Sequence, residues 1–105
     1  MTKKKYEFTG VTRMIPDGTV LHRIRLLRDI VGFKAGSLGG WIEKEDNLSH
    51  EGNCWVSESA EVRGSAEVSG LARVYGEACV YGSARVYDSA IVSGSAQVSG
   101  EARVR

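Results

Sequence analysis

The sequence predicts an all-β protein whose main part is a parallel β-solenoid, a coil of short strands stacked on one another. Three observations lead to this fold class. Valine recurs at every sixth position from Val56 to Val104, alanine stands two residues before each valine from Val62 onward, and glycine follows most valines by two residues, with Glu58 and Asp88 as the exceptions. Residues 1–37 do not follow this pattern, and we expect them to form a β-hairpin cap.

The hairpin is predicted from two extended runs, YEFTGVTRMI and VLHRIRLLRDI, which flank the triplet Pro16-Asp17-Gly18. A Pro-Asp-Gly turn between two β-prone runs is typical of a hairpin. A short helix over residues 21–30 is the alternative for the second run.

Residues 38–55 are predicted to form a degenerate first coil, because terminal repeats of a solenoid cap the array and differ from the others. Counting back in sixes gives the expected positions of its side chains. Leu38, Lys44 and His50 fall at valine positions, and Ile42, Leu48 and Cys54 fall at alanine positions.

Residues 56–105 are predicted to form the regular array. In the unit Ala-x-Val-x the side chains of a strand alternate, so alanine and valine share the inner face, and the glycine that follows permits a sharp bend. Apolar residues at this spacing would not stay on one face of a helix. No hairpin dipeptides separate the units, which argues against an antiparallel meander. Each rung is therefore expected to stack about 4.8 Å above the last.

The repeat, with an aliphatic residue every six positions and a small residue two before it, resembles the hexapeptide-repeat, left-handed β-helix family. The resemblance covers Val56 to Val104 and Ala60 to Ala102, although glycine here comes one residue later than in the common family pattern. It implies triangular coils of three repeats each, a left-handed coil, and a homotrimer with parallel axes. The whole chain also resembles small uncharacterised hexapeptide-repeat proteins of bacteriophages and prophages.

A coil of three repeats sorts the outward side chains onto three faces and places Tyr75, Tyr81 and Tyr87 as a belt around one coil. The first face carries the most apolar set, and exposed Trp, Tyr and Arg together are typical of a contact surface. The binding or interface residues that we predict are Trp55, Arg73, Tyr75, Ile91, Tyr81, Tyr87 and Arg85. We expect Trp55 to stack over Arg73.

Many proteins of the resembled family are acyltransferases that use histidine as a general base. The repeats contain no histidine and no inserted loop, so His22 and His50 are the only weak catalytic candidates. Two histidines are too few for the three-histidine zinc site of a hydrase, and no metal or other cofactor is expected. The chain carries a net charge of +1, which disfavours nucleic-acid binding.

The preferred function is therefore a non-catalytic oligomeric binding or assembly protein. The narrow valine core and the uncapped last rung favour an oligomer, a trimer first and end-to-end pairing second. The phage resemblance implies a host protein or a signalling nucleotide as partner, and thus a counter-defence role. A hexapeptide-repeat acyltransferase and a structural virion component are the alternatives.

A cytoplasmic location is expected, because the sequence has neither a secretory signal nor a transmembrane run, and no membrane partner is predicted. Cys54 and Cys79 fit no metal or redox spacing, which indicates free thiols in a reducing compartment.

Overall fold

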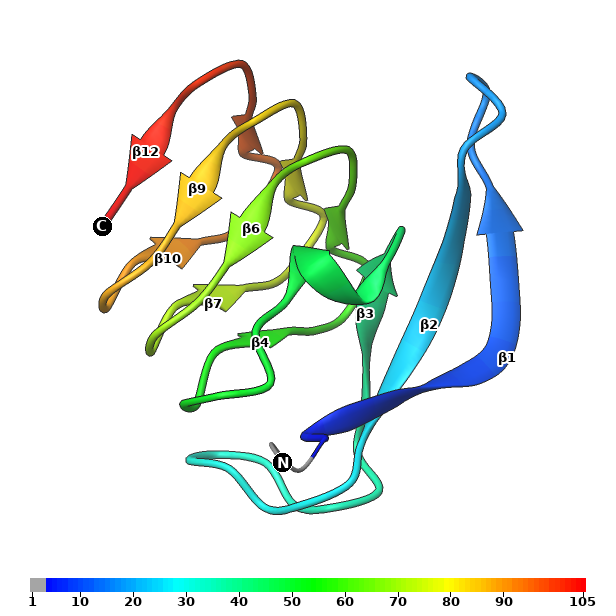
Figure 1. Ribbon diagram of the computed structural model, residues 1–105, viewed down its shortest axis with the longest axis vertical. Coiled ribbons are helices and arrows are strands. Elements are labelled where there is room, and N and C mark those ends of the chain that lie inside the picture. Colours follow the sequence, from blue (N-terminus) through cyan, green and yellow to red (C-terminus); the bar gives the residue numbers. More distant parts are fainter. Residues whose placement is uncertain (1–3) are drawn as a thin grey trace.

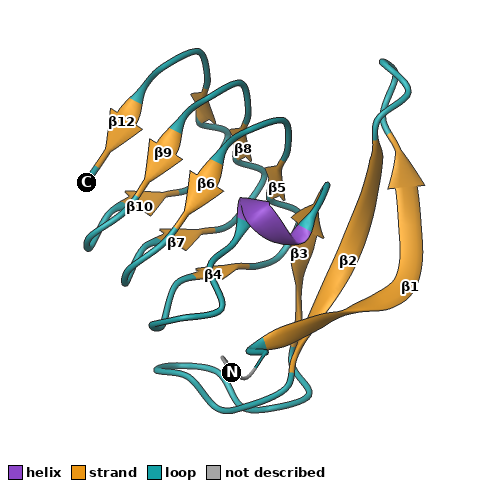
Figure 2. Cartoon of the chain, viewed as in Figure 1, coloured by secondary structure: helices purple, strands orange, loops and turns teal. Residues whose placement is uncertain are grey.

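The six-residue repeat folds into two-residue strands that stack in register, and the computed structural model describes residues 4–105 in this form (Figure 1). The result is an all-β parallel solenoid of about four turns with a long hairpin beside its first coil, as the sequence predicts (Figure 2). No helix among these residues is long and apolar enough to cross a membrane. The short strands are β4 (Trp55–Val56), β5 (Glu61–Val62), β6 (Glu67–Val68), β7 (Arg73–Val74), β8 (Cys79–Val80), β9 (Arg85–Val86), β10 (Ile91–Val92), β11 (Gln97–Val98) and β12 (Arg103–Val104).

Parallel pairing between strands three repeats apart holds the coil together. Val74 pairs with both Val56 and Val92, so three rungs stack valine on valine. Backbone N–H groups donate to the carbonyl oxygens of the next rung, for example Arg73 N to Ala90 O at 2.9 Å and Tyr75 N to Val92 O at 3.0 Å. The three-repeat period defines three faces: face one carries β4, β7 and β10, face two carries β5, β8 and β11, and face three carries β6, β9 and β12.

In the regular repeats the interior is a column of small aliphatic side chains, made of valine and alanine. From Val56 to Val92 every repeat valine and alanine is buried. In the last rung Val98 and Val104 are half-buried and Ala96 is exposed, since no further rung of the described chain covers them.

Left-handed backbone at the corners explains the glycine positions and both exceptions to them. Corner glycines have φ between +64° and +71° in the regular repeats, and Glu58 and Asp88 occupy the same conformation at +59° and +54°. Only glycine adopts this region without strain. Crowding adds a second requirement, since a Cβ on Gly82 would lie 2.9 Å from the nitrogen of Gly100.

The first coil differs from its expected phase. Ile42 pairs with Val62 and Leu48 forms a bridge to Val68, so both occupy valine positions rather than alanine positions. Each of these pairs is separated by two positions more than the regular three repeats, which means that two extra residues lie between Leu48 and Cys54. Cys54 does stand at an alanine position, because the nitrogen of Trp55 donates to Ala72 O as in a regular rung.

The hairpin consists of β1 (Tyr6–Met14) and β2 (Val20–Leu26), and β2 then pairs antiparallel with β3 (Leu38–Ile42). The prediction of a hairpin around Pro16-Asp17-Gly18 is confirmed, and the alternative helix over residues 21–30 is wrong. Strand β3 joins β5 in parallel, so the hairpin extends the sheet of face two (Figure 1). A 3-10 turn, η1 (Glu45–Asn47), follows β3 in the first coil.

A buried lysine closes the base of the coil. Lys5 is fully buried, and its Nζ donates to Cys54 O at 2.6 Å and lies 3.1 Å from Cys54 Sγ. Two further carbonyl oxygens, of Glu51 and Gly52, lie 3.5 Å away. Above it, the hydroxyl of Tyr6 donates to Leu48 O at 2.6 Å. Carbonyl groups of the first coil that no lower rung receives are thus satisfied by side chains of the cap.

We predict that Gly82→Ala destabilises the fold more than Gly100→Ala. Both positions have left-handed backbone, at +71° and +65°, but a Cβ at Gly100 would meet nothing within 4 Å. Strain alone costs about 1–2 kcal/mol in each variant, and the clash with the next rung adds about 1–3 kcal/mol for Gly82→Ala only. Urea unfolding of the two variants measures the difference. Equal losses would contradict the close approach of the corners.

We also predict that Lys5 gives stability a rising pH dependence in the alkaline range. Burial lowers the pKa of Lys5 from 10.5, so between the folded value and 10.5 the unfolded chain binds more protons than the folded chain. The free energy of unfolding therefore rises with pH across that window. Lys5→Met is expected to flatten the rise, whereas Lys4→Met, at an exposed neighbour, is expected to keep it.

Urea unfolding at several pH values from about 8 to about 10 measures this slope. Tyr6 contributes with the opposite sign above this range, and the raised pKa of Cys79 does so within it, so the slope of Lys5→Met is compared with that of the wild type. Burial raises the pKa of Tyr6, so above its ordinary value of 10.0 only the unfolded chain loses that proton. An unchanged slope in Lys5→Met would show that the buried ammonium is not its source.

Candidate partner-binding faces

The three faces differ in chemistry, although they share one backbone. Tyr75, Tyr81 and Tyr87 follow the valines of β7, β8 and β9, so one tyrosine stands on each face of a single coil. Tyr75 is exposed, and the other two are half-buried. The belt expected from the sequence therefore has three different surroundings.

Face one carries an apolar patch centred on an arginine. Ile91 and Val31 are 63% and 69% exposed, and Tyr75 lies beside a hollow of about 250 Å³ that Phe33 and Arg73 also line. The guanidinium of Arg73 donates to Val31 O at 2.5 Å and lies 5.4 Å from the centroid of the Phe33 ring. The loop after β2 thus joins the solenoid here. We call these five residues the face-one patch.

Trp55 is not part of this exposed patch, which corrects the expectation from the sequence. It stands at the outward position paired with Arg73, but it is 1% exposed. The cap covers it, with Tyr6 and Phe33 ring centroids 6.3 Å and 6.4 Å away. The cation–π partner of Arg73 is Phe33 and not Trp55. Counting along the repeat predicts the direction of a side chain but not what the non-repeating segment places over it.

Face two is partly covered by the hairpin. Arg13 of β1 pairs with Glu61 and lies 4.4 Å from the ring of Trp41, and Asp17 at the hairpin tip lies 4.0 Å from Arg63. Arg63 in turn lies over the ring of Tyr81 at 4.3 Å. Much of this face is therefore engaged within the chain. Arg13 and Trp41 were not among the predicted site residues, although Trp41 stands out in the run LGGWIE.

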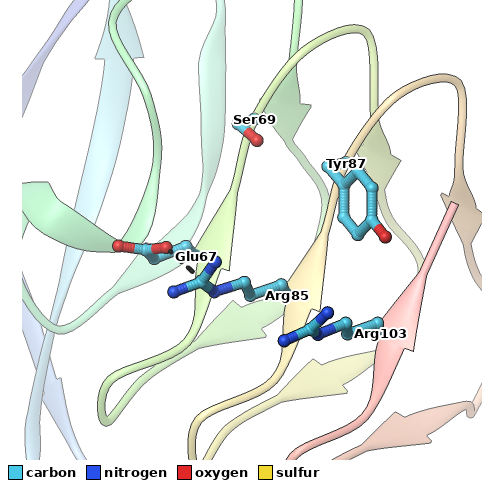
Figure 3. Close-up of a pocket in the computed structure, with 5 residues that line it drawn as sticks. All are labelled: Glu67, Ser69, Arg85, Tyr87 and Arg103. Carbon is cyan, nitrogen blue, oxygen red and sulfur yellow. Dashed lines mark ion pairs between the residues drawn. The ribbon is translucent and has the colours of Figure 1, made fainter.

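Face three contains a hollow of about 380 Å³ lined by side chains from three successive rungs (Figure 3). Glu67, Arg85 and Arg103 form one column along it, and Ser69 and Tyr87 form the opposite wall (Figure 3). Arg85 Nε lies 3.5 Å from the carboxylate of Glu67, whereas Arg103 has no ion-pair partner within residues 4–105.

A second hollow of about 370 Å³ continues face three toward the first coil. It shares Glu67 and Ser69 with the first hollow, and its other polar lining residues are Glu45, Asp46, Ser49 and His50. Two hollows that share a wall make one track along the solenoid axis. Glu45 and Asp46 were not predicted from the sequence, because only the lengthened first coil brings η1 beside β6.

His50 is a structural residue of the cap. Its Nδ1 accepts from the backbone nitrogen of Lys5 at 3.0 Å, and its Nε2 lies 2.9 Å from the carboxylate of Glu45. The ring also stacks on Tyr6 at 4.1 Å. Because Nδ1 accepts a hydrogen bond, the proton of the neutral ring sits on Nε2. No ring lone pair is left for a substrate in this arrangement.

His22 and the two cysteines offer no assembled catalytic group either. His22 lies on β2 and stacks on Phe8 at 4.3 Å. Cys54 is buried beside Lys5, and burial raises the pKa of the half-buried Cys79 on face two. Within the described range, no three residues among His, Cys, Asp and Glu are grouped as a metal site would require.

Comparison with known proteins gives a match to part of the chain. No family model matches the chain. Over 50 residues it is 38% identical to a protein of Escherichia coli (strain K12) named "Uncharacterized acetyltransferase YdcK". The match covers 44% of this chain and 15% of the relative, so the chain spans only a small part of that protein's length. The solenoid and this match together fit a hexapeptide-repeat β-helix.

Proposed function

We propose that this chain is a non-catalytic binding and assembly module, in which the solenoid is a rigid scaffold and the face-one patch contacts a partner protein. The exposed cluster of Ile91, Val31 and Tyr75 around Arg73 is the observation that carries the proposal. Contiguous exposed apolar side chains are unusual on a protein without partners. Aromatic and arginine anchors are the residues that dominate contact energies.

The face-one patch is also held in a fixed conformation before any partner binds. Arg73 is fixed by its hydrogen bond to Val31 and by the Phe33 ring, so it loses little freedom when a partner covers it. The patch lies where cap and coil meet, and its Phe33 ring lies 6.4 Å from the ring of buried Trp55. A rigid apolar surface with one oriented cation fits a partner that presents apolar side chains next to a carboxylate.

We predict that Ile91→Asp abolishes partner retention and that Gln97→Asp does not. Ile91 and Gln97 occupy equivalent outward positions in neighbouring strands of one rung, on faces one and two, and both are exposed. The immobilised chain is incubated with a bacterial lysate, and retained proteins are identified by mass spectrometry. We expect a protein that binds the wild type and Gln97→Asp but not Ile91→Asp. The same proteins on all three chains, or none on any, would contradict the proposal.

An acyltransferase is the second candidate, because the partial relative is named as an acetyltransferase. Against it stand the engaged nitrogens of His50 and the stacked ring of His22. General-base catalysis needs a ring nitrogen within reach of the proton that it removes.

We therefore expect no release of free thiol from acetyl-coenzyme A above the buffer rate with a panel of amine and hydroxyl acceptors. A thiol-reactive dye measures the release. Turnover by the wild type that is lost in His50→Gln or His22→Gln would instead establish the acyltransferase. Far-ultraviolet circular dichroism of both variants checks that they still fold.

The finer parts of the expected function stay predictions. They include a homotrimer with parallel axes, a phage origin, and a host protein or signalling nucleotide as the partner. Mass spectrometry of small molecules released from the purified chain tests the nucleotide part of this set.

A further inference from the structure

We propose that face three is a self-complementary docking surface on which a second copy of the chain binds antiparallel. The surface is the track formed by the two hollows that share Glu67 and Ser69. It lies on a different face from the face-one patch, and the proposal does not depend on the function proposed above.

Charges change sign along this track. Its first half is acidic, with Glu45 and Asp46 at η1 and Glu67 on β6. Its second half is basic, with Arg85 on β9 and Arg103 on β12 (Figure 3). One rung separates each step from Glu67 to Arg103. Glu67, Arg85 and Arg103 thus follow one another over about two rung spacings, or roughly 10 Å, and Asp46 of η1 lines the hollow on the acidic side of Glu67.

Reversing this order exchanges acids and bases, so a second copy of the chain in the opposite direction is complementary to the first. When a second copy is turned end for end and laid on the first, Asp46 faces Arg103 of the second copy and Glu67 faces its Arg85. A two-fold axis between the rungs of Glu67 and Arg85 makes each contact occur twice, as an isologous interface requires. Parallel copies would place like charges opposite each other on this face, which is unfavourable.

The unpaired charges lie at the two ends of the track, where they are available to another chain. Glu45 already contacts Lys4 and His50, and Glu67 contacts Arg85. Asp46 and Arg103 have no ion-pair partner within residues 4–105, and both are exposed. A small anion would satisfy Arg103 but leave Asp46 unpaired, whereas a second copy satisfies both. Ser49 and Ser69, which line the hollows beside the charged column, are small enough to allow close approach.

The interface has properties that an experiment can measure. One side of the coil, four rungs high, offers less area than the roughly 800 Å² per partner of a standard stable complex. We therefore expect a weak dimer that dissociates with added salt, because the screening length falls from about 10 Å at 0.1 M to about 3 Å at 1 M. Sedimentation velocity of the full chain at several concentrations, at low and at high salt, tests this expectation.

Charge reversal supplies the decisive comparison. Arg103→Glu and Asp46→Arg each turn two attractions of the dimer into two repulsions, so we expect each variant alone to dimerise roughly tenfold more weakly or worse. Mixed together, the two variants form a heterodimer in which both end pairs are opposite in sign. The mixture should therefore recover the wild-type dimer fraction, as should the double variant Asp46→Arg/Arg103→Glu. Lys34→Glu reverses the charge of an exposed residue on the cap, away from face three. It is the matched control and should leave the dimer fraction unchanged.

Each outcome decides the proposal. Recovery on mixing, without any effect of Lys34→Glu, supports the antiparallel contact. A wild type that stays monomeric at low salt overturns it, and so does a trimer whose mass is unchanged by Arg103→Glu. An equal loss of dimer in the mixture and in the single variants overturns it as well, because Asp46 of one copy would then not face Arg103 of the other. Failure here leaves the pull-down with Ile91→Asp unaffected, since that experiment concerns another face.

Discussion

Hydrogen bonding between each strand and the strand one coil further along the chain is the constraint on which the rest of this structure depends. Every strand of the coil is only two residues long, so no strand is stable by itself. Each strand is stabilised by its hydrogen bonds to the neighbouring rungs. The pairing fixes which side chains stack, for example Val56, Val74 and Val92. It also fixes the outward columns, so surface chemistry on each face is a direct consequence of the backbone period.

The regular array could be predicted because its requirements are local and repeated. A column of valine, a column of alanine and a left-handed corner leave few alternatives at each position, and even Glu58 and Asp88 adopt the corner conformation of glycine. The hairpin was predictable from its turn. The first coil was not, because two extra residues after Leu48 move Ile42 and Leu48 to valine positions, and counting back in sixes does not detect these two residues.

The candidate surfaces were predictable only in part, for a related physical reason. Outward residues of the repeat could be assigned to faces, and Arg73, Tyr75 and Ile91 lie together as expected. Whether an outward residue is exposed depends on the non-repeating segment, which buries Trp55 and adds Val31 to the patch. Contacts between segments of different sequence character follow from tertiary packing, which no periodicity encodes.

Uniform rungs have a consequence for how the chain reaches this fold. A slip of one repeat would place valine on valine again and would satisfy the same backbone groups, yet it would move each outward residue to a neighbouring face. The array by itself therefore distinguishes poorly between correct and shifted alignments. The first coil does distinguish them, since Asn47 donates to Gly64 O and Ala66 O while Lys5 fills the base. The irregular N-terminal segment thus sets the alignment of every later rung. A ribosome synthesises this segment before the repeats, so it is available as a template when they emerge.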